Sequence, residues 1–87
     1  MEEEPDAKMR YYFDLVIGKE VSSDEEGLEL PDARAAQEEA ALALAEMARE
    51  LPSDVDKDGL RKIAVEVRDN AGLLMTVRFD FEDRTVQ

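Results

Sequence analysis

The sequence predicts an α+β domain in the order β-β-α-β-β, with one helix packed on one face of a four-stranded antiparallel sheet. Two segments, 9–17 and 63–82, alternate apolar and polar residues, which gives each strand one apolar and one polar face. Between them, an alanine-rich segment repeats apolar residues at helical spacing. Turn-forming residues at 69–72 divide the second alternating segment into two strands.

The first hairpin is expected to combine one long strand with a shorter, interrupted one. Residues 9–17 form the long strand, and Gly18-Lys19 predicts a tight turn into a short strand near 20–22. The acidic segment 23–27 is rich in turn-forming residues. Alternation returns at 28–30, which we expect to continue the second strand after this bulge.

The helix is expected between Asp32 and Pro52. The Asp32 carboxylate can accept the free N–H groups of the first turn, and Pro52 ends the helix. Alanine has high helix propensity and lets the first half of the helix approach the sheet closely. The predicted buried stripe consists of Ala33, Ala36, Ala40, Ala43, Leu44, Met47 and Leu51.

After the helix, residues 52–61 are expected to form a polar connection to the second hairpin. Asn70 and Gly72 are both able to adopt left-handed geometry in the hairpin turn. The polar face of the sheet mixes acids and bases, so cross-strand ion pairs explain it better than an RNA-binding platform does. Its expected members are Arg10, Tyr12, Asp14, Glu66, Arg68, Arg78, Asp80 and Glu82.

Length and composition predict one folded domain over 9–87, preceded by a disordered acidic tail over 1–8. The chain contains no cysteine and no histidine, which removes disulfides, thiolate metal sites and the commonest general base. A net charge of −12 repels nucleic acid and anionic membranes and attracts basic partners. We therefore expect a cytoplasmic protein that binds neither nucleic acid nor membrane.

The sequence contains one candidate metal site. It predicts no catalytic residue and no cofactor. Asp54, Asp56 and Asp58, followed by Gly59, match the first half of an EF-hand calcium loop. The bidentate glutamate expected at position twelve is replaced by Val65, so any calcium binding would be weak. The alternative interpretation is a solvated turn between the helix and the next strand.

Several exposed side chains are candidates for contacts with a partner protein. Val16 and Leu74 are out of phase on the polar sheet face, and Leu42 lies opposite the helical stripe. An open sheet also leaves two edges for strand addition, which makes a homodimer one expected arrangement. The candidate interaction residues are Tyr12, Val16, Leu42, Leu74 and Arg78.

Three motifs together resemble a small bacterial family of domains of unknown function. They are the segments 10–15 (RYYFDL), 24–32 (DEEGLELPD) and 67–72 (VRDNAG), which are similar to the family's R-Y-F-F-D-L, D-E-x-G-x-E-x-P-D and V-R-D-x-x-G motifs. The resemblance covers residues 10–82. It implies no established activity, so it assigns no functional residues to this chain.

The expected function is therefore a non-catalytic protein-interaction module. Its partner is an unknown protein, for which a basic protein and a second copy of the chain are the two expectations. Two alternatives stay open. One is an antitoxin-like or nucleic-acid-mimicking regulator, because the opening strand and helix also resemble antitoxin domains of the HicB type at the level of fold. The other is a weak calcium binder that uses the 54–59 loop.

Overall fold

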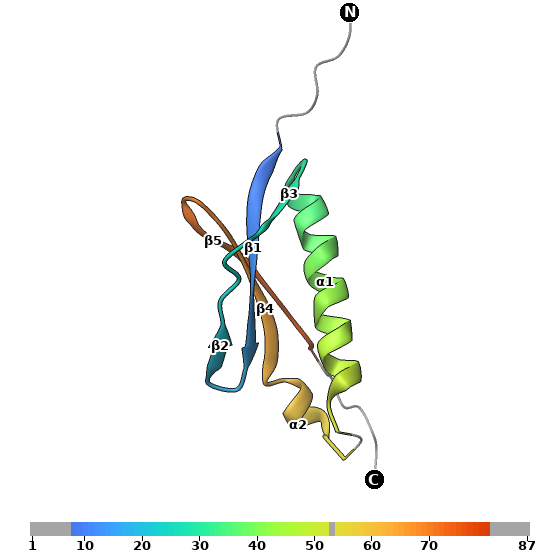
Figure 1. Cartoon of the computed structure of the whole chain (residues 1–87). Coiled ribbons are helices and arrows are strands. Elements are labelled where there is room, and N and C mark those ends of the chain that lie inside the picture. The colour runs from blue at the N-terminus through green and yellow to red at the C-terminus, as the bar shows by residue number, and fades with distance from the viewer. Residues whose placement is uncertain (1–7, 53, 81–87) are drawn as a thin grey trace, which may run out of the picture.

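The computed structural model describes residues 8–52 and 54–80, and over these residues it has the predicted α+β arrangement. Helix α1 (Ala33–Glu50) lies along one face of an antiparallel sheet (Figure 1). The strands are β1 (Met9–Ile17), β2 (Glu20–Ser22), β3 (Leu28–Leu30), β4 (Ile63–Asp69) and β5 (Gly72–Arg78). The order across the sheet is β2-β1-β4-β5, and β3 also pairs with β1. The predicted tail over 1–8 lies outside the described residues except for Lys8, which is exposed.

One edge of the sheet consists of two short strands that both pair with β1. Ser22 of β2 lies opposite Leu15, and Leu28 of β3 lies opposite Tyr11. The five residues 23–27 therefore face only three residues of β1. This confirms the predicted bulge between two parts of one interrupted strand.

The β4–β5 hairpin turns through residues 69–72, as predicted, but by a different mechanism. The Asp69 carboxylate accepts the backbone N–H groups of Ala71 (2.8 Å) and Gly72 (3.1 Å). Gly72 has a positive φ of 139°, whereas none of the described non-glycine residues has a positive φ. Asn70 therefore does not use the left-handed geometry that is open to it, and the Asp69 side chain organises the turn.

A second bulge interrupts β5 near this turn. Val67 pairs with Met75 and Arg68 pairs with Leu73, so Leu74 is an extra residue on β5. This bulge is the physical reason that Leu74 falls out of phase with the alternating pattern. β5 ends at Arg78, and the predicted continuation to Glu82 passes beyond the described residues.

Helix α1 begins at the predicted cap, since Asp32 Oδ1 accepts the N–H of Ala35 at 2.9 Å. The helix packs chiefly against β4, with further contacts to β5 and β3. Its small residues Ala36 and Ala40 have no exposed surface, so the backbone of α1 lies close to the sheet. The buried core contains Tyr11, Ala36, Ala40, Leu44, Ile63, Val65 and Val67.

The edges of the predicted core are more exposed than the pattern indicates. Met9 and Ile17 retain about half of their surface because they lie at the two ends of β1, and Ala33 is exposed at the start of α1. The connection after α1 also differs from the prediction, since it contains the short helix α2 (Lys57–Leu60). Asp56 caps α2 by accepting the N–H of Gly59 at 3.1 Å.

Candidate functional site

A group of charged side chains occupies the polar face of the sheet, on β1 and β4. Asp14 is the described charged residue with the least exposed surface, at 7%. Arg68 donates from Nε to Asp14 Oδ2 at 2.8 Å, and from Nη2 to the backbone oxygen of Asp24 at 3.0 Å. The guanidinium also lies 4.5 Å from the ring centre of Tyr12, which is opposite Arg68 in the β1–β4 register.

Asp24 connects this group to the bulged segment 23–27. Its backbone N–H donates to Asp14 Oδ1 at 2.8 Å. Its carboxylate accepts three backbone N–H groups, from Phe13 at 3.1 Å, Glu26 at 3.1 Å and Gly27 at 3.2 Å. Asp24 therefore satisfies donors that the bulge removes from the β-sheet ladder.

The electrostatics of Asp24 follow from these contacts. Burial favours the neutral carboxyl group and so raises its pKa. The backbone hydrogen bonds from Gly27, Phe13 and Glu26, together with the charge of Arg68, act in the opposite direction and outweigh burial. The pKa of Asp24 is consequently lowered from its ordinary value, and the ionised form stabilises the fold.

Arg10 and Gly27 hold the same bulged segment closely against β1. Arg10 Nη1 donates to the backbone oxygen of Glu26 at 2.6 Å, and Nη2 forms an ion pair with Glu29 at 3.0 Å. Gly27 has a φ of 72°, and a Cβ atom there would lie 3.0 Å from the Tyr11 carbonyl oxygen. Glycine is therefore required both for the backbone angle and for the close approach.

The residues that carry the family resemblance thus have a structural role. Arg10, Asp14, Asp24, Gly27 and Arg68 all come from the three motifs, and together they bind the 23–27 segment to the sheet. We call them the bulge network. The predicted cross-strand ion pairing is confirmed by Asp14 and Arg68. Within 8–52 and 54–80, no buried side-chain nitrogen or oxygen lacks a hydrogen-bond partner.

The candidate calcium loop, residues 54–59, overlaps the short helix α2 and its N-terminal cap. Asp56 Oδ1 caps α2, and Asp58 forms an exposed ion pair with Arg61 at 4.0 Å. Among the described residues, Asp54, Asp56 and Asp58 are not brought together as a group that could hold a metal ion. The calcium hypothesis therefore stays a prediction.

The structure does not bring the five candidate interaction residues together on one surface. Val16 pairs with Val21 of β2 and with Ala64 of β4, whereas Leu74 lies at the opposite end of the β4–β5 hairpin. Among the other candidates, Arg78 lies nearest to Val16, because both residues pair with Ala64.

The remaining two candidates lie in different surroundings. Tyr12 is half-buried beneath Arg68, so its ring already has a partner within the chain. Leu42 is 61% exposed on α1, the helix that covers the other face of the sheet.

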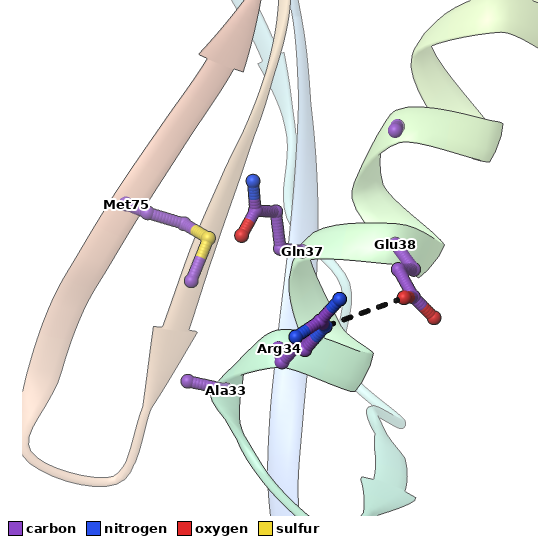
Figure 2. Close-up of a pocket in the computed structure, with 6 residues that line it drawn as sticks. Ala33, Arg34, Gln37, Glu38 and Met75 are labelled. Atoms are coloured by element: carbon purple, nitrogen blue, oxygen red, sulfur yellow. Dashed lines mark ion pairs between the residues drawn. The ribbon is translucent and has the colours of Figure 1, made fainter.

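A groove lies between α1 and β5, and the sequence did not predict it. Figure 2 shows Gln37 of α1 and Met75 of β5 extending toward one another across the groove. The exposed ion pair between Arg34 and Glu38, at 3.8 Å, lies at its rim. The groove is open to solvent and has a volume of ≈ 540 Å³. It is lined by Ala33, Arg34, Gln37, Glu38, Ala41 and Met75.

β5, the strand that contributes Met75 to this groove, lies at one end of the sheet order. Its outer edge therefore has no neighbouring strand among residues 8–52 and 54–80. Leu73 and Leu74 are 61% and 45% exposed near one end of this edge. The only sequence signal for the surface was the out-of-phase Leu74, because the groove depends on how α1 and β5 are placed in space.

In the part of the chain that the structure describes, no helix has both the length and the apolar character needed to cross a membrane.

Comparison with known proteins gives a family but no characterised relative. No curated protein and no solved structure matches the chain. Residues 10–80 match the family described as Domain of unknown function (DUF6894). This match spans the three motifs and nearly all of the described fold, and the chain therefore belongs to the DUF6894 family.

Proposed function

We propose that this domain is a non-catalytic protein-interaction module that binds an extended segment of its partner along β5. One observation carries the proposal: among residues 8–52 and 54–80, β5 has no neighbour along its outer edge, and its Met75 side chain lines an open groove. An added strand would form main-chain hydrogen bonds with β5. Its alternate side chains would enter the groove, as in other cases of recognition by strand addition.

The use of the charged residues supports a binding role rather than a catalytic one. Asp14, Asp24 and Arg68 form the most buried charged group described, and their hydrogen bonds join parts of this chain to each other. Their chemistry is thus explained by stabilisation of the 23–27 segment. The cysteine-free composition supports a reducing compartment such as the cytoplasm as the place of action.

Site-specific photo-crosslinking in the cells that make the protein tests the proposal. A photoreactive amino acid at Leu74, beside the β5 edge, should yield a crosslinked protein. The same amino acid at Leu42 is the matched control, because Leu42 is also an exposed leucine but lies on α1. Absence of a product from Leu74, or the same product at equal yield from Leu42, would contradict binding along β5.

A further inference from the structure

We infer that the strand bound along β5 is the β5 strand of a second copy of this chain. This inference rests on the proposed function, since it names the partner of the same edge. The two copies would pair antiparallel about a two-fold axis, and their sheets would join into one continuous sheet.

The distribution of charge favours self-pairing at this edge. The chain has 23 acidic residues and a net charge of −12, so two copies repel each other over most of their surfaces. Residues 70–79 form the longest run without an acidic residue, and this run contains β5 together with the basic residue Arg78. β5 is therefore the strand along which two copies can approach with the least repulsion.

The two sheet edges also differ in how they are protected. Edge strands of natural proteins are commonly guarded by charged residues or proline. β2 contains Glu20, β3 contains Glu29, and the bulge network covers the segment between them. Residues 72–77 of β5 contain neither a charge nor a proline. The β5 edge is the one suited to strand addition.

The alternation of β5 makes it complementary to itself. After the bulge at Leu74, Met75 and Val77 lie on the helix side of the sheet and pack against the core. Residues directly opposite in an antiparallel pair point to the same face. With the axis beside Thr76, Met75 would lie opposite Val77 of the second copy and Leu74 opposite Arg78, so apolar side chains of the second copy would lie beside the groove that Met75 lines.

Sedimentation equilibrium of the full chain over a range of concentrations tests the inference. We expect the mass to rise from the 9.8 kDa of the monomer toward twice this value. Association should strengthen as the NaCl concentration rises, because salt screens the repulsion between two chains of net charge −12. A basic partner protein would show the opposite salt dependence.

Two pairs of variants locate the contact. Leu74→Lys should weaken self-association by about tenfold or more, because it adds a cation to an edge that meets Arg78 of the other copy. Leu42→Lys makes the same change at an exposed leucine of α1 and should leave association unchanged. Because the chain has no cysteine, Thr76→Cys should also form an intermolecular disulfide faster than Leu42→Cys.

The outcomes separate this inference from the proposed function. A monomer at all salt concentrations up to about 1 mM protein, or equal effects of the two lysine variants, would overturn self-pairing. Photo-crosslinking from Leu74 to a different protein would overturn self-pairing but retain the interaction module. No crosslinked protein from Leu74 would remove both.

Discussion

Replacing Asp14 by asparagine tests the bulge network most directly. The substitution keeps the shape of the side chain but removes its charge. The carbonyl oxygen of the new amide can still accept the N–H of Asp24, which lies 2.8 Å from Asp14 Oδ1. The amide nitrogen that replaces Oδ2 cannot accept the Nε–H of Arg68, and this removes the hydrogen bond of 2.8 Å between Arg68 Nε and Asp14 Oδ2.

The expected cost follows from the burial of the two partners. Breaking a fully buried ion pair costs about 3–5 kcal/mol. The Asp14 side chain is 10% exposed, but the Arg68 side chain is 36% exposed, so water replaces part of what Arg68 loses. One charged hydrogen bond is worth about 1.5–3 kcal/mol. We therefore expect Asp14→Asn to lower the free energy of unfolding by about 2–3 kcal/mol.

Urea unfolding at pH 7, followed by circular dichroism, measures this change. With a slope of about 1 kcal/mol per M for a small domain, the midpoint should fall by about 2–3 M. The matched control is Asp58→Asn, because the Asp58 side chain is 80% exposed and its ion pair with Arg61 is long. The control should change stability by less than about 0.5 kcal/mol. If both variants unfold at the same urea concentration, the structural role assigned to the bulge network is wrong.

Three further predictions test the core, the close approach of Gly27 to β1 and the electrostatics of Asp24. In the same urea assay, Ile63→Ala should lower the free energy of unfolding by about 2–5 kcal/mol. Its cross-strand neighbour Ile17 is half-exposed, so Ile17→Ala should lower the free energy of unfolding by less than about 1 kcal/mol. Gly27→Ala should cost about 1–3 kcal/mol more than Gly18→Ala, because both glycines have positive φ but a Cβ at Gly18 meets no atom within 4 Å. Asp24→Asn should be destabilising at pH 7. This deficit should shrink as the pH falls below about 4, because the lowered pKa of Asp24 stabilises the native fold above that pH and the benefit is lost as the carboxylate is protonated.

The sequence predicted the elements well because their signals are local. Alternation over 9–17, the Asp32 cap and the Pro52 stop each depend on residues close together in the chain, and the structure confirms all three. The two-residue turn at Gly18 is also local, since its φ of 63° matches the glycine position of a type II′ hairpin turn. The fold class followed from these elements alone.

The candidate site could be predicted only in part because its contacts are distant in sequence. Asp14 and Arg68 are 54 residues apart, and neither the depth of Asp14 nor the contact with Asp24 is visible in an alternating pattern. The mixture of acidic and basic residues on the polar face of the sheet did indicate ion pairs. The groove beside Met75 depends on the relative placement of α1 and β5, for which the sequence has no local signal.

The central β1–β4 pairing has a consequence for how the chain reaches its native alignment. Each hairpin closes locally, whereas Ile17 meets Ile63 only after the whole intervening helical region has been brought round. A slip of one residue between these two strands would turn every side chain of one of them to the wrong side. Asp14 would then enter the apolar layer without its cation, so the buried acid penalises the misaligned pairing and helps to select a single register.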